Sequence, residues 1–433
     1  MSLKTPIDKK DLRSFKNFVS LKRIFSFRIQ NSAFRIPNSA FSYIRLMDIS
    51  YILNHLGEER ENYYNAVSPP VFQTSNFRFK DVAALRLAFT NEKKYHIYSR
   101  GNNPTVEILR KKIAALAGAE DALVFASGAA AVTAAVMANV NYGEHVICVQ
   151  KPYSWTHKLL NEFLVRFGVQ STMVDGTNTQ NFADAIQPNT RIIFLESPNT
   201  FTFELQNIIE VVKLAKQHNI ITIIDNSYCT SLGQRCIEMG IDIEIHSASK
   251  HYGGHSDVVA GYLLCNQPMA DKIFASEYLN LGANISPHDA WLLIRSLRTL
   301  PIRLEKIKNT TDKIVAWLET HPQIEKVIYP FSKSFPQYDL AKQQMLWCGG
   351  LFSVQLKAKN VEEVETFCNA LKQFMLAVSW GGYESLIVPA CSFNPRRQYD
   401  DAGFPFNLIR FYIGLDDVEI LMEDLKQAFT KIE

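Results

Sequence analysis

The 433-residue sequence lacks a strong excess of charge of either sign. Its 46 Lys and Arg face 43 Asp and Glu, which leaves a formal net charge of +3 at pH 7. A charge this close to balance gives no electrostatic reason to expect a nucleic-acid partner or an acidic membrane partner. The sequence also has no apolar run that approaches the roughly 20 residues needed to cross a bilayer. With 47% hydrophobic and 21% charged residues, the composition is that of a globular protein with substantial cores.

Cysteine is scarce, and its spacing excludes the common metal and redox motifs. No two cysteines form a C-x-x-C pair, and none is spaced with histidine in the manner of a metal site. We therefore expect no bound metal, and reduced, mostly buried thiols in a cytoplasmic protein. The seven cysteines are Cys148, Cys229, Cys236, Cys265, Cys348, Cys368 and Cys391.

Positive charge is concentrated at the N-terminus. Residues 1–46 carry ten Lys and Arg and two Asp and Glu, a net charge of +8, so the remaining 36 basic and 41 acidic residues sum to −5. This basic, acid-poor leader has the character of a transit peptide, but it has no clean apolar core. It is equally read as a disordered extension or as upstream sequence translated by mistake. We expect Met47 to be the functional start.

A regular alternation of helices and short strands begins near Thr105. The strands are rich in β-branched residues and do not alternate with polar ones, which predicts a mostly parallel sheet covered by helices on both faces. Catalytic groups of such a fold gather at the carboxyl ends of the strands. The predicted strands are 122–126, 145–149, 171–174, 191–195, 220–224 and 241–246, and the predicted helices are 106–117, 129–140, 156–167 and 208–218.

A second pattern begins near residue 300 and predicts a smaller α+β domain. It contains a long helix over 289–318 interrupted by Pro301, strands at 327–329, 351–356 and 408–413, and helices over 361–374 and 418–432. Residues 47–105 are rich in Asn, Tyr and Pro and have weak periodicity. We expect four parts: the leader 1–46, an arm 47–105 that contacts a neighbouring subunit, a main domain 106–298 and a C-terminal domain 299–433.

The most informative segment follows the predicted strand that ends at His246. It places Ser247 and Ser249 two residues apart, so their hydroxyls point the same way on an extended chain and suit a phosphate. Lys250 stands beside them as a candidate Schiff-base nucleophile. Asp225, after the preceding strand, is the candidate partner of a pyridinium nitrogen. Each feature alone has a plainer reading, since Ser-x-Ser-Lys is common and an Asp after a strand often only forms a turn.

Three further positions are candidates for the same site. Gly128 and Ala129 begin a helix after a strand, and the free N–H groups of a helix start favour an anion. Tyr153 could stack on a planar ring, or it could be an ordinary packed loop tyrosine. Arg410 is a charge within an apolar strand, so it needs a buried partner, either a substrate carboxylate or an internal Asp or Glu.

Taken in order, these motifs resemble the Cys/Met-metabolism (transsulfuration) family of pyridoxal 5'-phosphate (PLP) enzymes, over roughly residues 60–433. The resemblance implies PLP fold type I, with an active site shared between two chains and usually a tetramer. It also implies that Tyr98 and Arg100 reach the neighbouring subunit's phosphate. The motifs are Tyr98-Ser-Arg100-x-x-Asn103-Pro104-Thr105, Glu196-Ser-Pro198, Asp225-Asn-Ser227, Ser247-x-Ser249-Lys250, Gly254-His-Ser-Asp257, Ser379-Trp-Gly-Gly-Tyr-Glu-Ser-Leu386 and Leu408-Ile-Arg410.

The resemblance assigns a role to each candidate residue. Lys250 holds PLP and then acts as the base at the substrate's Cα, Asp225 keeps the ring nitrogen protonated, and Tyr153 stacks on the ring. Arg410 and Ser379 orient the α-carboxylate of a sulfur amino acid, and Trp380 shapes the substrate wall. The phosphate is held by Gly128, Ala129, Ser247 and Ser249, with Tyr98 and Arg100 from the neighbouring subunit.

Two departures bear on which reaction the family member performs. The motif around Trp380 resembles that of the bacterial cystathionine β-lyase. Members of the γ-type more usually have Leu at this position. Thr200 stands where the γ-type pattern Glu-Ser-Pro-Thr-Asn-Pro has its Asn. We expect cystathionine β-elimination to homocysteine, pyruvate and ammonia. The alternatives are γ-type enzymes, namely cystathionine γ-synthase, cystathionine γ-lyase or methionine γ-lyase, and, from another class, a non-catalytic PLP or amino-acid binding protein.

Overall fold

The computed structural model describes residues 48–347, 349–393 and 403–432. All of them fall within one unit of the chain, Ile44–Glu433. The predictions made for the leader 1–46 and for a start at Met47 lie outside the described residues. No helix in the described ranges is both long enough and apolar enough to cross a membrane.

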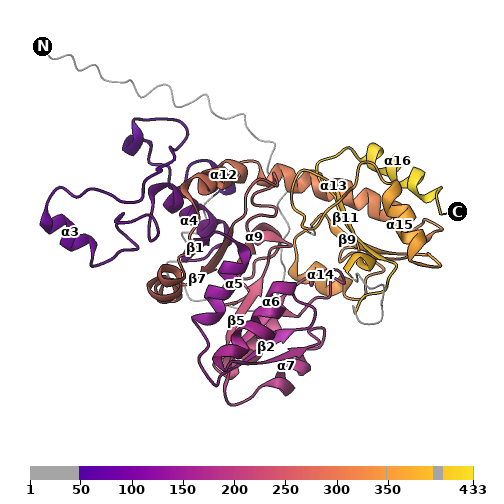
Figure 1. Ribbon diagram of the computed structural model, residues 1–433, viewed down its shortest axis with the longest axis horizontal. Helices are drawn as coiled ribbons and strands as arrows, with labels where there is room; N and C mark the ends of the chain where they lie inside the picture. The colour runs from indigo at the N-terminus through magenta and orange to yellow at the C-terminus, as the bar shows by residue number, and fades with distance from the viewer. Residues whose placement is uncertain (1–47, 348, 394–402, 433) are drawn as a thin grey trace, which may run out of the picture. The chain divides into compact units, whose positions relative to one another are not determined.

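The main domain is built on a seven-stranded sheet in the order β1-β7-β6-β5-β4-β2-β3 (Figure 1). The strands β2 to β6 pair in parallel, whereas β7 is antiparallel to both β1 and β6. The predicted mostly parallel sheet is therefore confirmed, with one antiparallel strand that the sequence reading did not include. The strands are β1 (Asp121–Phe125), β2 (His145–Val149), β3 (Gln170–Val174), β4 (Thr190–Glu196), β5 (Ile221–Asp225), β6 (Ile243–Ser247) and β7 (Gly261–Cys265).

Helices cover both faces of this sheet. Successive residues of β1 enter different cores, because side chains of a strand alternate between its faces. Leu123 belongs to the buried cluster that includes residues of α5, α8 and α10, and Val124 belongs to the one that includes residues of α4 and α12. The helices are α4 (Pro104–Ala117), α5 (Gly128–Met137), α6 (Ser154–Lys158), α7 (Thr179–Ala185), α8 (Ile208–Gln217), α9 (Thr230–Gly233), α10 (Gln267–Ile273), α11 (Leu279–Leu281) and α12 (Pro287–Leu297).

Local sequence explains where these helices start and stop. Asn103 caps α4 by accepting from the Thr105 N–H, and Pro104 occupies the first turn, where no backbone donor is needed. Gly118 ends the helix at φ +73°, a left-handed conformation that favours glycine. The helix predicted over 156–167 is less regular, since α6 continues into a π-helical segment η3 (Leu159–Phe163) and a 3-10 segment η4 (Leu164–Phe167).

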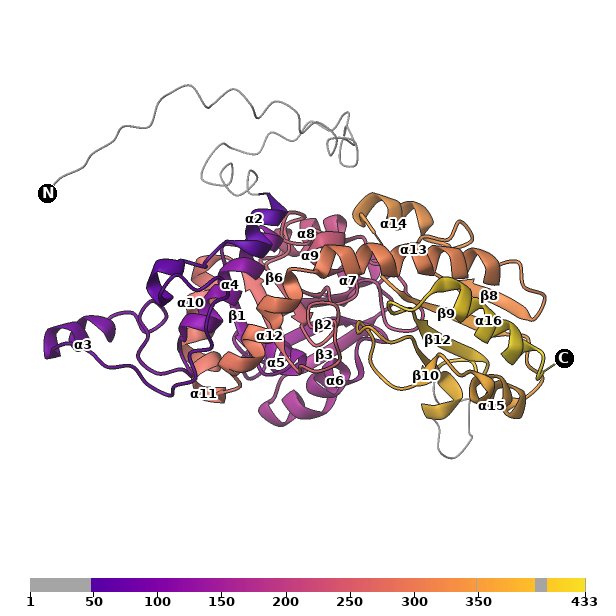
Figure 2. The same ribbon diagram turned by 90° about the horizontal axis from the view of Figure 1, so that it is seen from above.

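A separate, smaller sheet forms the C-terminal domain, in the order β10-β11-β12-β9-β8 (Figure 2). Its helices pack on the sheet to form a second core. Pro301 lies in the first turn of α13, so the predicted interruption is the boundary between α12 and α13. The elements are α13 (Leu300–Leu318), β8 (Ile324–Ile328), α14 (Tyr338–Gln344), β9 (Leu351–Leu356), α15 (Val361–Ala370), β10 (Met375–Leu376), β11 (Leu386–Pro389), η6 (Ala390–Phe393), β12 (Leu408–Tyr412) and α16 (Val418–Phe429).

The segment before α4 has little core of its own. It contains α2 (Ile49–Asn54), η2 (Arg60–Tyr63) and α3 (Val82–Ala88). The buried Lys112 of α4 anchors the first residues of this segment. It donates to the carbonyls of Ile52 and Leu53 and pairs with Glu58 at 3.0 Å. Most side chains of α3 remain solvent-exposed. The exact domain limits at residues 105 and 298 remain predictions.

Candidate active site

Lys250 lies in a tight turn directly after β6. The Lys250 N–H donates to the Ser247 carbonyl at 3.1 Å, and the Gly254 N–H donates to the Lys250 carbonyl at 2.8 Å. The buried Arg303 of α13 donates to the His251 carbonyl at 2.8 Å. These bonds fix the backbone on both sides of the lysine, so the side chain is presented from a rigid support.

The surroundings of the Lys250 amine favour its neutral form. Burial lowers the pKa of Lys250, the charge of Asp225 opposes this shift, and the charge of Arg410 adds to it. The same interactions show that the structure brings these three predicted residues together. A neutral amine is the nucleophilic and basic form of lysine, as the predicted role requires.

Asp225 ends β5, in register with Glu196 at the end of β4. Its Oδ1 accepts from the Ser227 N–H at 2.9 Å. Glu196 Oε2 accepts from the Tyr153 N–H at 2.6 Å, and burial together with the Asp225 charge raises the pKa of Glu196. Glu196 thus links the predicted ring-stacking tyrosine to the predicted ring-nitrogen partner. The sequence analysis quoted Glu196 within a motif but gave it no role.

Tyr153 stands at the start of α6 and is 44% exposed. Burial of part of the ring raises the pKa of its phenol, and the charges of Asp225 and Glu196 raise it further. The phenol therefore lies within electrostatic reach of Asp225 and stays protonated at neutral pH. This placement suits a ring that stacks on a planar group, rather than a tyrosine packed into a core.

A close approach of two chain segments forms an anion cradle. A Cβ added to Gly128 would lie 2.9 Å from the Ser247 Cβ, so only glycine allows α5 to start against β6. The Ser127 hydroxyl caps the Ala130 N–H at 3.1 Å, and no hydrogen bond within the described residues uses the N–H groups of Gly128 and Ala129. These free donors at a helix start suit a phosphate.

The two predicted phosphate-binding serines are placed differently. The strand ends at Ser247 and a turn begins at residue 248, so the extended chain assumed for the pair does not continue to Ser249. The Ser249 hydroxyl accepts from the Ala260 N–H at 3.0 Å and donates to the Ala260 carbonyl at 3.2 Å. Among the described residues nothing bonds to the Ser247 hydroxyl, so Ser247 is the freer of the two.

Arg410 lies on β12 and is 8% exposed. It donates to Thr200 Oγ1 at 3.4 Å and to the Ser379 carbonyl at 3.3 Å. No carboxylate of the described residues pairs with it, which removes the reading of an internal ion pair within those ranges. Burial lowers the pKa of Arg410 to about 10, so the guanidinium is still charged at neutral pH. A buried cation whose described partners are all neutral is suited to bind an anion.

The loop 379–381 packs against the lysine turn. The Trp380 ring centroid lies 5.8 Å from Lys250 Nζ. Gly381 has φ +93°, and a Cβ there would come within 2.6 Å of the Lys250 and His251 backbone. Ser379 contacts Arg410 through its carbonyl rather than its hydroxyl. Trp380 is therefore placed where it can shape a substrate wall beside the lysine.

Tyr98 and Arg100 stand apart from this group. Both are exposed, and the Arg100 guanidinium carbon lies over the Tyr98 ring at 5.5 Å. Within the described ranges, no contact links either side chain to Lys250, Asp225 or Arg410 of the same chain. This arrangement agrees with residues that serve another subunit, but the single chain does not test that role.

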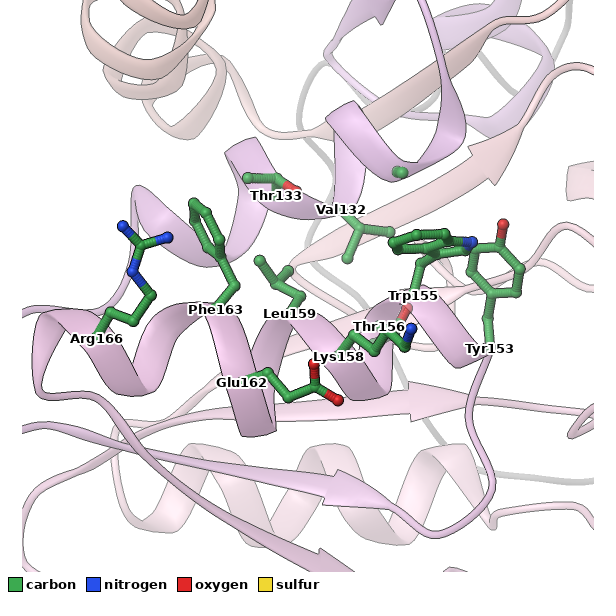
Figure 3. Close-up of a pocket in the computed structure, with 11 residues that line it drawn as sticks. Val132, Thr133, Tyr153, Trp155, Thr156, Lys158, Leu159, Glu162, Phe163 and Arg166 are labelled. Atoms are coloured by element: carbon green, nitrogen blue, oxygen red, sulfur yellow. The ribbon is translucent and has the colours of Figure 1, made fainter. Parts of the chain in front are cut away.

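A cavity adjoins the site rather than containing it. It has a volume of about 520 Å³ and lies between α5 and the helical stretch 153–166 (Figure 3). Ala129 and Tyr153 line its end, whereas Lys250 and Asp225 are not among its lining residues. The apolar side chains of Trp155, Leu159 and Phe163 form much of the wall. We therefore place the chemistry at the strand ends and treat the cavity as a separate surface.

A lysine, an aspartate and an anion cradle at the carboxyl ends of a parallel sheet define a PLP-dependent enzyme of fold type I. The sequence profile of the Cys/Met metabolism PLP-dependent enzymes matches residues 51–430, so the chain belongs to that family. It is therefore an enzyme, and the alternative of a non-catalytic binding protein is wrong. The residues described above fit the cofactor, since the N–H donors of the cradle suit a phosphate, Asp225 suits a protonated ring nitrogen and Lys250 suits an aldehyde.

Similar proteins within the family catalyse different eliminations. The chain is 36% identical to an L-methionine gamma-lyase from Treponema denticola, over 86% of this chain and 94% of that protein. It is 34% identical to a cystathionine beta-lyase from Lactococcus lactis, over 87% of this chain and 97% of that protein. The crystal structure of metB from Corynebacterium glutamicum superposes with a TM-score of 0.84 at 30% identity, covering 90% of this chain and 100% of that one. The family-level activity is a PLP-dependent carbon–sulfur lyase.

Proposed function

We propose that this enzyme catalyses β-elimination of cystathionine to homocysteine, pyruvate and ammonia. The observation that carries the proposal is the position of Trp380 beside the Lys250 amine. A second observation supports it, since Thr200 contacts Arg410 where the γ-type pattern has an asparagine. Both positions that depart from the γ-type pattern thus lie next to the residues assigned to the reaction.

Each residue has a defined task in this proposal. Arg410 binds the α-carboxylate, and Lys250 removes the proton from the substrate's Cα. Asp225 holds a proton on the ring nitrogen, while Tyr153 stacks on the ring. Gly128, Ala129 and Ser247 hold the phosphate, and Ser249 joins them when its hydroxyl turns from the Ala260 carbonyl. The cofactor, when bound, supplies the sink for the electrons released at Cα.

The indole of Trp380 narrows the choice of bond to be broken. A bond at Cβ breaks readily only when it lies near perpendicular to the plane of the electron sink. A bulky ring beside the amine restricts how the substrate's side chain rotates about Cα–Cβ. We propose that this restriction holds the Cβ–S bond in the reactive orientation. A γ-type reaction instead needs a second proton transfer at Cβ.

The γ-type reactions remain the alternative, and the similarity to methionine gamma-lyase favours them. Product analysis decides between the two. Cystathionine and methionine are incubated separately with the PLP-loaded enzyme, and the keto acids are identified. We expect pyruvate and homocysteine from cystathionine, and no methanethiol from methionine. Predominant 2-oxobutyrate would overturn the proposal in favour of a γ-lyase. Cystathionine formed from an activated homoserine ester and cysteine would indicate a γ-synthase.

We also propose a homotetramer, made of two dimers whose subunits share active sites. The chain exposes two apolar surfaces, one on the arm with Val82, Leu87 and Phe89 and one at the cavity with Trp155 and Phe163. Exposed apolar surfaces of this kind mark protein interfaces. A two-fold axis would let the arm of each subunit cover the cavity of the other. Tyr98 and Arg100 would then approach the partner's cradle.

We infer a cytoplasmic location from the thiols. The six described cysteines are buried, and within the described residues no disulfide joins Cys148, Cys236, Cys265 or Cys368 to another cysteine. Burial raises the pKa of Cys148 and Cys236 well above the ordinary value for a thiol, so both stay protonated and unreactive. Protected thiols of this kind fit a reducing compartment.

A further inference from the structure

We propose that Phe201 is a positioning residue that determines how Arg410 receives the substrate. Its ring covers one side of the guanidinium, so a carboxylate can dock only along the open edge. The inference rests on the proposed role of Arg410 as the α-carboxylate site. It adds a residue outside the set that the sequence motifs assigned.

The contact between the two side chains is close and buried. The Cζ atom of Arg410 lies over the Phe201 ring, 4.7 Å from its centroid. Phe201 is 5% exposed, and two further rings hold it, Phe393 at 5.3 Å and Phe404 at 5.1 Å between centroids. The ring therefore has little freedom to move away from the guanidinium.

The backbone of Phe201 also indicates a constrained position. Its φ is +64°, in the left-handed region that a residue with a bulky side chain adopts only when the surroundings impose it. The surrounding loop starts after β4 and carries Thr200, which is bonded to Arg410. Two consecutive residues of one constrained loop thus contact the same guanidinium.

The electrostatics explain why a ring is suited to this position. Arg410 is a buried cation, and no described carboxylate compensates its charge. An aromatic face attracts a cation, and the attraction is strongest where water is excluded. Unlike a carboxylate, the ring adds no negative charge that would compete with the substrate. Phe201 thus stabilises the charged arginine and leaves it able to bind an anion.

The hydrogen bonds leave a defined opening for the ligand. A guanidinium has five N–H donors. Within the described residues, Thr200 and the Ser379 carbonyl take two of them, which leaves three. The Phe201 ring covers one face of the Arg410 guanidinium, and the two hydrogen bonds fix the plane of that group. The remaining donors therefore form one edge, where a carboxylate can bind in the same plane.

The chain offers a matched control two residues away. Phe203 also has a left-handed backbone, with φ +53°, and is 1% exposed. Its ring contacts Tyr228 at 5.5 Å between centroids, and no contact with Arg410 is present in the described part of the chain. Substituting each phenylalanine by leucine removes similar bulk from one loop, but only one change removes a ring from the arginine.

The test compares Phe201→Leu, Phe201→Tyr and Phe203→Leu in the PLP-loaded enzyme. Calorimetry measures the Kd for L-alanine, which carries the α-carboxylate and no sulfur leaving group, and kinetics separates KM from kcat. For Phe201→Leu we expect both the Kd and KM to rise roughly tenfold or more, with kcat changed less than about threefold. Phe201→Tyr keeps the aromatic face and should restore most of the affinity, and Phe203→Leu should leave the Kd within about threefold.

Two results would overturn the inference. One is an unchanged Kd for alanine in a folded Phe201→Leu protein with normal cofactor absorbance. The other is an equal loss of affinity in Phe201→Leu and Phe203→Leu, which would make the effect one of loop packing. Failure of the proposed reaction looks different, because the wild-type enzyme would then release no pyruvate from cystathionine while the Kd for alanine still responded to Phe201.

Discussion

The amine of Lys250 lies 5.8 Å from the centroid of the Trp380 ring. The lysine comes from the main domain and the tryptophan from a loop of the C-terminal domain, so the site needs both. Burial by such neighbours lowers the pKa of Lys250, which favours the neutral amine. We therefore expect the packing between loop 379–381 and the lysine turn to affect catalysis.

Replacing Lys250 by Ala should abolish most of the turnover. The change removes both the attachment of the cofactor and the base at Cα, and general base catalysis alone is typically worth ~10²–10⁴-fold. Steady-state release of keto acid measures the loss. Lys213→Ala is the control, because its exposed side chain on α8 pairs only with Glu210 in the described structure. Near-normal turnover in Lys250→Ala would refute the assignment.

Gly381→Ala should impair catalysis because the added methyl group pushes the lysine turn out of place. A Cβ at Gly381 would lie 2.6 Å from the backbone of Lys250 and His251, so the lysine turn has to shift. We expect kcat to fall at least about tenfold, since small displacements of catalytic groups are costly. Gly143→Ala is the matched control, because Gly143 has φ +78° but nothing within 4 Å of an added Cβ. Equal effects in both variants would mean that backbone strain, and not contact with Lys250, is responsible.

The sequence predicted the position of the candidate residues at the strand ends better than the geometry around them. Asp225, Ser247 and Lys250 were predictable because they follow apolar strands whose carboxyl ends share one edge of the sheet. The strand β7 was not predicted, because Gly261 is weak as a strand residue. Gly261 is explained only in three dimensions, since a Cβ there would lie 2.4 Å from the Ser127 carbonyl oxygen.

The contacts of Arg410 and Ser249 also could not be predicted from the sequence. An arginine in an apolar strand needs a partner, but which of many acidic residues approaches it depends on packing of distant segments. The structure shows Thr200 and the Ser379 carbonyl instead. Likewise, the hydrogen bonds between the Ser249 hydroxyl and the Ala260 backbone depend on a turn and a hairpin that the local sequence does not specify. The partners of Arg410 and Ser249 are set by the packing of segments that are distant in the sequence.

Mixing two impaired variants at limiting PLP should restore activity if the site is shared. Arg100→Ala should weaken retention of the cofactor by loss of a charged phosphate contact, typically ~1.5–3 kcal/mol. In a hybrid with Lys250→Ala, one of the two sites holds both native residues. Random exchange at equal amounts should therefore recover about a quarter of the wild-type activity.

A second mixture controls for nonspecific rescue. Asp225→Asn should leave the shape of the site but slow removal of the Cα proton, because the ring nitrogen loses its anionic partner. Asp225 and Lys250 lie in the same chain's site, so hybrids of Asp225→Asn with Lys250→Ala contain no intact site. Recovery in this mixture would show that rescue is nonspecific or that Asp225 and Lys250 come from different chains. No recovery in the Arg100 mixture after verified subunit exchange would argue for a site built from one chain.

His251 should make the folded protein sensitive to acid. Its ring is buried, neither ring nitrogen has a hydrogen-bond partner among the described residues, and burial with the charges of Arg303 and Lys250 lowers the pKa of His251 to about 3. The unfolded chain binds this proton near pH 6.5, so the stabilising contribution is present above that pH and is lost as the pH falls toward 3.

The measurement is urea unfolding at fixed protein concentration at pH 7 and pH 5. The free energy of unfolding of His251→Phe should fall by about 2 kcal/mol less than that of the wild type over this interval. His288→Phe, at an exposed position on α12, should keep the wild-type pH dependence. Parallel curves for His251→Phe and the wild type would show that His251 is not a neutral buried group in the folded protein.

The most direct test of the account is to locate the residue that carries the cofactor. The PLP-loaded protein is reduced with borohydride, digested, and its peptides are analysed by mass spectrometry. The account predicts a pyridoxyl group on Lys250 and on no other lysine, and none after the same treatment of Lys250→Ala. A modification at a different lysine, or an unmodified Lys250 in protein that retains its cofactor, would contradict it.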